Sequence, residues 1–394
     1  MTSIDSALAA LKAGDFQSRW EMVKDCAALG EAIVPSLVAL LKEADTDEEL
    51  AWFIVKILGT FREPEAVIAL LDLLDPDQPE DLSAIASEVL AGMGAEILEP
   101  LAPLLEDPSR QRLGVRAIAQ INHPEAVPRL LKVWAAQPAP EVRQLIVEAL
   151  HPFPALNTIP VFLQALTDES AKVRQGAIAG LVACKSLAGD DAAHNAWVEA
   201  MLPSLGDPVP AVAEQTARAL GRFATATAVA ELIQKGKNIT TTSALRYSII
   251  QALGWVGTPE AIEGLIQIWE GLSQHPAPPE PLLKEILVSL SRTTIAQTEA
   301  AQATVALLRS PSLKVSISLQ STAAFCLGRL GIKATLPHLI ALLAEPDYGL
   351  RLQVIAALKQ IAPDSAHAEL LHRAADPDMP PSLADGLAIA LQEW

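Results

Sequence analysis

The residue types that most often carry chemistry are few and widely spaced in this sequence of 394 residues. Its three cysteines, Cys26, Cys184 and Cys326, lie far apart in apolar stretches without any C-x-x-C pair, so we expect buried, reduced thiols. The seven histidines show no metal-site spacing. The sequence has neither a Gly-rich phosphate loop nor a G-x-S-x-G motif. We therefore expect no catalytic residues, no resident metal and no cofactor.

Charge is spread unevenly along the chain, whose formal net charge is −18. Up to Arg110 there are 22 Asp and Glu against 7 Lys and Arg, whereas the rest of the chain has 25 acidic and 22 basic residues. An acidic surface repels nucleic-acid phosphates and attracts basic partners. We expect no nucleic-acid partner but a protein with a basic segment; an acidic face kept for solubility is the alternative. The candidate contacts are Glu65, Glu96, Glu99, Glu106 and Asp107.

The sequence contains no run of about eighteen uncharged apolar residues, the length that a membrane span requires. Its first residues, MTSIDSALAALKAGDF, lack a basic segment before an apolar one. We expect no membrane insertion and a cytoplasmic location.

One phrase recurs along the chain and indicates an internal repeat. It reads REPEAVIALLDLL at 62–74, INHPEAVPRLLKVW at 121–134 and GTPEAIEGLIQIW at 257–269. Each Leu-rich stretch of this kind is paired with an Ala- and Gly-rich helical stretch, such as 213–223, and Asp-Pro breaks separate the pairs. Such a pair cannot bury its apolar stripe alone, so neighbours must stack. The pattern predicts an all-α, right-handed α-solenoid of about eleven short helical hairpins.

The repeat boundaries predict a single array over residues 1–394. Its proline-rich passage at 272–283 could divide the array into 1–271 and 284–394. A basic, Thr-rich stretch at 235–243, KGKNITTTS, is expected to be a connector, although loops that depart from the period can also grip partners.

Many first helices end in Leu-Gly, as at 220–221, 253–254 and 327–328, many second helices open with Pro-Glu-Ala, and an Asp often precedes the next first helix. In these marks the sequence resembles HEAT-repeat proteins, and its short repeats resemble the PBS-lyase HEAT-like subclass. The resemblance implies a ladder of bonds between repeats, with Asp168 pairing with Arg174 and Asp347 with Arg351. Arg143 would occupy the arginine position without a matching Asp.

The same resemblance suggests two functions besides protein binding. One is that of the E/F-type phycobilin lyases of the phycobilisome antenna, which handle linear tetrapyrroles. A bilin needs cations for its propionates and aromatic walls for its conjugated system. The densest such set in this sequence is Arg218, Arg222, Arg246, Tyr247 and Trp255. The other function is metal-cluster assembly, for which Cys184 would be the candidate ligand.

We nevertheless favour a non-catalytic scaffold or adaptor that holds a partner protein on its concave, second-helix surface. Tryptophans on predicted second helices are candidate anchors for that partner, or else they close the junction with the next repeat. These are Trp134, Trp197 and Trp269. Trp20, Trp52 and Trp255 fall on predicted first helices, where we expect packing roles.

Overall fold

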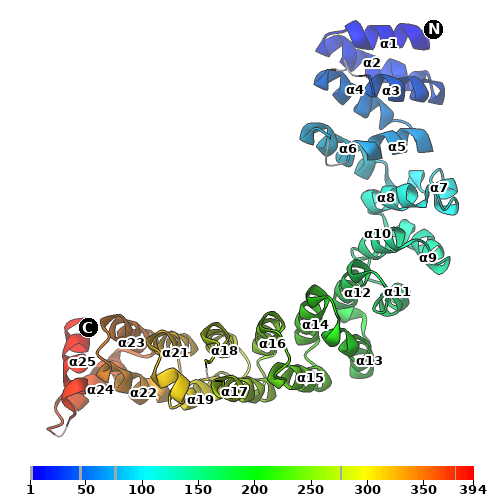
Figure 1. Cartoon of the computed structure of the whole chain (residues 1–394). Coiled ribbons are helices and arrows are strands. Elements are labelled where there is room, and N and C mark those ends of the chain that lie inside the picture. Colours follow the sequence, from blue (N-terminus) through cyan, green and yellow to red (C-terminus); the bar gives the residue numbers. More distant parts are fainter. Residues whose placement is uncertain (1–2, 44–46, 75–77, 276, 378) are drawn as a thin grey trace. The chain divides into compact units, whose positions relative to one another are not determined.

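The computed structural model describes residues 3–43, 47–74, 78–275, 277–377 and 379–394, which form helices and no strand (Figure 1). Contacts within the chain divide it into two compact units, Met1–Leu187 and Ala188–Trp394. None of the described helices has both the length and the apolar character needed to cross a membrane.

The first unit is built of helical hairpins in two layers, preceded by α1 (Ile4–Ala13). Each first helix packs on the next first helix, from α2 through to α12, and α3 packs on α5 in the other layer. The first helices are α2 (Phe16–Ala28), α4 (Glu48–Leu58), α6 (Glu80–Gly92), α8 (Gln111–Ile121), α10 (Pro140–Leu150) and α12 (Ala171–Ala183). The second helices are α3 (Val34–Leu41), α5 (Pro64–Asp72), α7 (Ala102–Glu106), α9 (Val127–Ala135) and α11 (Ile159–Ala165).

The second unit repeats this plan. Its first helices pack in the series α14, α16, α18, α21, α23, and its second helices in the series α13, α15, α17, α19. The first helices are α14 (Pro210–Phe223), α16 (Ser243–Val256), α18 (Glu280–Arg292), α21 (Ile317–Leu330) and α23 (Tyr348–Ile361). The second helices are α13 (Asp191–Met201), α15 (Ala226–Lys237), α17 (Pro259–Ser273), α19 (Gln297–Leu307), α22 (Leu336–Ala341) and α24 (Pro363–Ala374). The short α20 (Pro311–Lys314) precedes α21, and α25 (Pro381–Gln392) ends the unit.

The helices begin where the sequence supplies a capping side chain or a proline. The side chains of Asp47, Thr242 and Asp347 each accept a hydrogen bond from the backbone amide three residues further on, which satisfies one free N–H of the first turn. Pro64 and Pro140 stand in the first turn of α5 and α10, where a missing N–H costs nothing. These local signals account for the short helices.

Glycines at the ends of first helices allow adjacent helices to approach closely. A Cβ added to Gly221 would lie 2.7 Å from the Cβ of Ala252, and one added to Gly254 would lie 2.6 Å from that of Ser289. Neither separation is compatible with real side chains, so the Leu-Gly ending sets the distance between α14, α16 and α18. Gly257 ends α16 with φ +61°, a conformation that L-residues adopt rarely.

The all-α solenoid predicted from the sequence is confirmed. Within the described residues each unit contains five successive hairpins, and the consecutive helices α12 and α13 follow those of the first unit and precede those of the second, which agrees with about eleven repeats. The single array over 1–394 and the possible boundary at 272–283 stay predictions. Residues 272–283, of which 276 lies outside the described residues, fall within the second unit, where α18 packs on α16 and α17.

Candidate functional site

The acidic residues proposed as partner contacts lie on the second-helix side of the first unit and are exposed. Three of them are engaged in ion pairs between repeats: Arg62 Nε lies 3.5 Å from Glu96 Oε2, Arg129 Nη2 lies 2.8 Å from Glu99 Oε2, and Lys132 Nζ lies 3.0 Å from Glu106 Oε1. Their carboxylates remain largely solvated, so these pairs contribute little to stability.

The two other acidic candidates differ in their surroundings. Asp107 accepts hydrogen bonds from the Oγ and the backbone N–H of Ser109, at 2.7 and 2.9 Å. These bonds lower the pKa of Asp107 below its ordinary value. Glu65 stands in the first turn of α5, where its charge faces the positive end of the helix dipole. The second-helix side is therefore acidic, but part of its charge is compensated within the chain.

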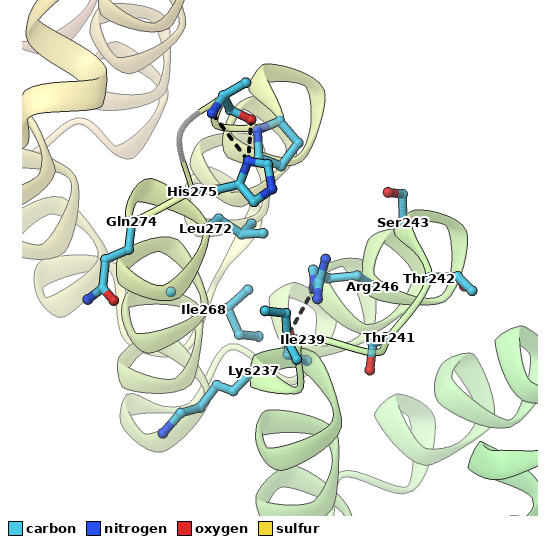
Figure 2. Close-up of a pocket in the computed structure, with 14 residues that line it drawn as sticks. Lys237, Ile239, Thr241, Thr242, Ser243, Arg246, Ile268, Leu272, Gln274 and His275 are labelled. Atoms are coloured by element: carbon cyan, nitrogen blue, oxygen red, sulfur yellow. Dashed lines mark hydrogen bonds between the residues drawn. The ribbon is translucent and has the colours of Figure 1, made fainter.

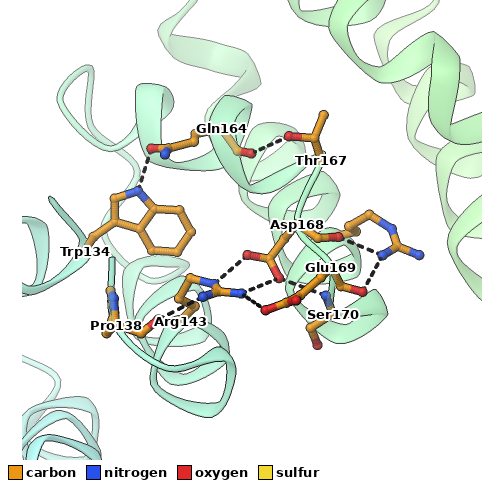
Figure 3. A network of polar contacts seen from close by, with 9 residues as sticks. Trp134, Pro138, Arg143, Gln164, Thr167, Asp168, Glu169 and Ser170 are labelled. Carbon is orange, nitrogen blue, oxygen red and sulfur yellow. Dashed lines mark hydrogen bonds and ion pairs between the residues drawn. The ribbon is translucent and has the colours of Figure 1, made fainter. Parts of the chain in front are cut away.

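The tryptophans proposed as anchors are buried. Trp134 on α9 is 5% exposed, Trp197 on α13 is 7% exposed, and Trp269 on α17 is 1% exposed. The indole Nε1 of Trp134 donates a hydrogen bond of 2.8 Å to Gln164 Oε1 on α11, which ties one repeat to the next (Figure 3). In this conformation the three indoles offer a partner almost no surface.

The ladder of polar contacts differs from the expected pairing. Arg143 on α10 does have an Asp partner: its Nε lies 2.6 Å from Asp168 Oδ2 and its Nη2 lies 3.2 Å from Asp168 Oδ1 (Figure 3). Its Nη2 also donates to Glu169 Oε1 at 2.8 Å. The hydrogen bond to Asp168 raises the pKa of the Arg143 guanidinium above its ordinary value. The expectation that Arg143 lacks a matching Asp is wrong.

The arginine of one first helix thus reaches forward to the Asp before the next first helix. Arg19 does the same on α2, with its Nη2 3.1 Å from Asp47 Oδ2. Arg174 instead donates to the main-chain oxygens of Asp168 and Glu169, at 2.8 and 3.1 Å. The sequence pattern missed the direction of the rung because Asp168 lies only six residues before Arg174 along the chain, whereas its carboxylate faces Arg143 across the junction.

The second expected rung is also a main-chain contact. Arg351 Nε donates to the carbonyl oxygens of Leu343 and Glu345, at 3.0 and 2.7 Å, whereas the Asp347 carboxylate caps α23 by accepting from the N–H of Leu350. Arg351 therefore fixes the preceding turn rather than pairing with the Asp347 side chain.

The second unit contains a hollow of about 740 Å³ between the ends of α15 and α17 and the start of α16 (Figure 2). Ile268 and Leu272 form its apolar wall, Arg246 faces them, and Ile239 of the Thr-rich loop projects beside Arg246. The Arg246 guanidinium donates to main-chain oxygens, with its Nε 3.0 Å from Gly236 O. Burial lowers the pKa of Arg246.

The set proposed for a bilin does not come together around this hollow, since Arg246 is the only one of the five that lines it. Tyr247 points to α18, where its hydroxyl donates a 2.9 Å hydrogen bond to Glu285 Oε2, which raises the tyrosine pKa. Arg218 on α14 donates to Ser248 Oγ at 3.2 Å, and Arg222 is exposed on the same helix. Trp255 is 48% exposed, so packing covers only part of this side chain.

The three thiols are buried, as the sequence predicts. The Sγ of Cys184 lies 3.8 Å from Thr158 Oγ1, and desolvation raises the pKa of this thiol. Metal ligation requires the thiolate, which this environment disfavours.

Sequence reasoning missed an aromatic surface on the first helices of the first unit. Trp20 on α2 is 54% exposed, so packing covers only part of this side chain, and Trp52 on α4 is half-buried beside it. The two tryptophans stand 32 residues apart, one repeat, and this spacing is the signal that places them at matching positions on neighbouring helices.

A hollow of about 570 Å³ adjoins this aromatic surface at the start of α4 and α6. Its lining combines Phe16, Trp52 and Leu82 with acidic side chains from the first turns of both helices. Rings and carboxylates therefore share one surface on the first-helix side.

Several solved structures resemble this chain in fold. Kap95p, from a study in which its binding induces the switch loops of RanGDP to adopt the GTP-bound conformation, superposes with a TM-score of 0.56 at 14% identity, covering 99% of this chain and 62% of that chain. Importin beta gives a TM-score of 0.55 at 15% identity, covering 99% and 64%. A Kap121p mutant gives 0.55 at 14% identity, covering 94% and 46%. This chain spans less than two thirds of the length of each, and at these identities the likeness concerns the fold alone.

Curated proteins give no match to this sequence. The family model for HEAT repeats matches residues 4–91, 98–181, 159–238, 198–271 and 301–391, which together span most of the chain. The stacked hairpins of this chain and the Leu-Gly endings of its first helices agree with this match. The chain belongs to the HEAT-repeat family.

Proposed function

We propose that this HEAT-repeat chain is a non-catalytic, cytoplasmic scaffold or adaptor that holds another protein on its concave, second-helix surface. The acidic N-terminal region, up to residue 110, receives a basic segment of that partner. The observation that carries this proposal is the concentration of carboxylates up to residue 110, where the sequence contains 22 acidic and 7 basic residues.

The exposure of these carboxylates supports an electrostatic role. The side chains of Glu96, Glu99 and Glu106 are 80%, 83% and 69% exposed even though each has an ion-pair partner. Since exposed pairs in water are worth only about 0–1 kcal/mol, an incoming cation can displace the internal partner at small cost. The excess of negative charge accelerates encounter with a basic segment, an effect that salt screens over about 10 Å at 0.1 M.

The fold offers further support. Extended stacks of hairpins present long surfaces on which a partner can lie. Kap95p, which shares this fold, binds RanGDP. We extend to this chain only the general property of binding another protein, and not the specific partner of Kap95p.

A charge-reversal experiment tests the proposal. The chain carrying Glu96→Lys, Glu99→Lys, Glu106→Lys and Asp107→Lys is used as bait, and captured proteins are quantified by mass spectrometry at rising salt. We expect the variant to lose basic partners that the unchanged chain captures at low salt, and both to capture little at high salt.

The matched control reverses four exposed acidic residues on second helices of the second unit and alters the net charge equally. These are Glu231, Glu260, Glu263 and Glu270. Thermal unfolding establishes that both variants stay folded. Equal partner loss in both variants would show that net charge, not the acidic second-helix surface of the first unit, governs capture, and would contradict the proposal.

The alternative function is the handling of a linear tetrapyrrole, as in phycobilin lyases of the PBS-lyase HEAT-like subclass. One observation favours it: the hollow at α15, α16 and α17 has the volume of a small-ligand site and includes the half-buried cation of Arg246. Arg246 would bind a propionate there. Purification from a bilin-producing host tests this function, because a bound bilin absorbs visible light and Arg246→Gln should reduce that absorbance. A colourless protein would refute it. The burial of Cys184 leaves metal-cluster assembly without a supporting observation.

A further inference from the structure

We propose that the first-helix side of the first unit binds an Arg- or Lys-rich segment of a partner protein, through aromatic rings bordered by carboxylates. We call the rings of Phe16, Trp20 and Trp52 the aromatic row. This inference rests on the proposed protein-binding function and adds a binding surface on the layer opposite to the second helices.

The aromatic row is an ordered surface feature. Phe16 and Trp20 have ring centroids 6.3 Å apart and planes 17° apart, and Trp20 and Trp52 have centroids 6.4 Å apart and planes 23° apart. The fully buried Phe53 contacts all three rings from below, with centroid separations of 5.2, 6.4 and 5.0 Å. The row is therefore held in place by the core.

The exposure of these rings calls for an explanation. Phe16 and Trp20 are each 54% exposed, and each could bury more apolar surface in a protein contact. Scattered exposed apolar residues are ordinary, but adjoining aromatic rings form a patch of the kind that marks an interaction site. Because aromatic side chains dominate the energetics of protein interfaces, this row is a suitable anchor.

The carboxylates beside the aromatic row can pair with cations of a partner. Glu48, Glu80 and Asp81 line the adjoining hollow with Trp52, and none of the three has an ion-pair partner within the described residues. Helix dipoles favour acidic residues in first turns, which explains part of this placement. They do not explain why the same surface exposes a row of rings.

The combination selects a cationic partner. Lys56 Nζ lies 5.5 Å from the centroid of the Trp52 ring, so the row already accepts one cation from the chain itself. One guanidinium or ammonium group of the incoming segment can pack on Trp20. Other cationic side chains of the same segment can then pair with Glu80 and Asp81. Nucleic acid would meet repulsion from these carboxylates, and a second copy of the chain would bring the same negative charge.

Fluorescence anisotropy with a labelled, amidated oligo-arginine peptide tests the inference at about 0.15 M and at higher salt. We expect the variant with Trp20→Leu and Trp52→Leu to bind the peptide about tenfold more weakly, as the loss of two cation–π contacts predicts. The rim variant with Glu48→Gln, Glu80→Gln and Asp81→Asn should also weaken binding, with a reduced dependence on salt. Trp255→Leu is the matched control, because it removes an exposed tryptophan from a first helix of the second unit.

These measurements test the aromatic row independently of the proposed function of the second-helix surface. Equal affinity of the ring variant and the unchanged chain would overturn it, while partner capture by the second-helix surface is measured by its own variants. A dimer that dissociates on Trp20→Leu, seen by light scattering, would make a second copy the occupant and also overturn it. If the double ring variant unfolds, the single Trp20→Leu and the exposed rim variant take its place, and unchanged affinity in both refutes the inference.

Discussion

The rung between Arg143 and Asp168 should be a strong polar link between repeats, because both of its side chains are shielded. Their side chains are 14% and 8% exposed, and two hydrogen bonds of 2.6 and 3.2 Å join them. Removing one partner of a buried pair costs about 3–5 kcal/mol, but Asp168 also accepts from the N–H of Ser170 at 2.9 Å and keeps that bond. We therefore expect a coupling energy of roughly 2–3 kcal/mol, in the range of a charged hydrogen-bonded pair.

A double-mutant cycle with Arg143→Ala and Asp168→Ala isolates this coupling. Global unfolding of a repeat array is not two-state, so the local free energy is measured by amide hydrogen exchange in α10, α11 and α12. The expected coupling corresponds to a change of about 30- to 150-fold in exchange rate.

The rung of Arg19 with Asp47 provides the matched comparison. The Arg19 side chain is 7% exposed, but its partner Asp47 is 58% exposed, so water screens the pair. We expect the same cycle with Arg19→Ala and Asp47→Ala to give a coupling of only about 0.5–1 kcal/mol. A coupling for Arg143 and Asp168 no larger than that of Arg19 and Asp47 would refute the reasoning that burial sets the strength of a rung.

Three further predictions concern packing, thiol reactivity and pH. Gly180→Ala would place a Cβ 2.3 Å from the buried Phe162 ring and should lower the local free energy of unfolding, measured by amide hydrogen exchange in α12, by about 1–3 kcal/mol, whereas Gly271→Ala faces open space and should leave exchange in α17 unchanged or slower. Burial raises the pKa of the Cys326 thiol to about 11, so a thiol reagent at pH 8 should modify it only after denaturation; fast labelling of the native chain would contradict its burial. Hydrogen bonds from the Leu50 N–H and from Arg19 lower the pKa of Asp47, so its contribution to stability is present above pH 3.8 and lost as pH falls through the lowered value. Asp47→Asn should flatten that acid-induced loss, and identical acid unfolding curves for the two chains would disprove the role of this carboxylate.

The sequence by itself determined the helical hairpins. The signals that begin each helix act within about one turn and can therefore be read from the sequence without tertiary context. They are prolines such as Pro64 and Pro140, capping residues such as Asp47, and apolar residues at helical spacing. The period of the Pro-Glu-Ala phrase then implied stacking, because a lone hairpin leaves an apolar stripe exposed. The acidity of the N-terminal region, up to Arg110, follows from composition alone.

The tertiary structure alone decided which face of each helix is covered. Trp134 and Trp20 both stand on helices that the sequence predicts, yet the first is buried against the next repeat and the second is 54% exposed. Likewise, Arg143 pairs with Asp168 across a junction, although Arg174 is closer to that residue in sequence. Helical periodicity fixes the angle between side chains on one helix, but the rotation and offset at which the next hairpin packs determine what each side chain meets.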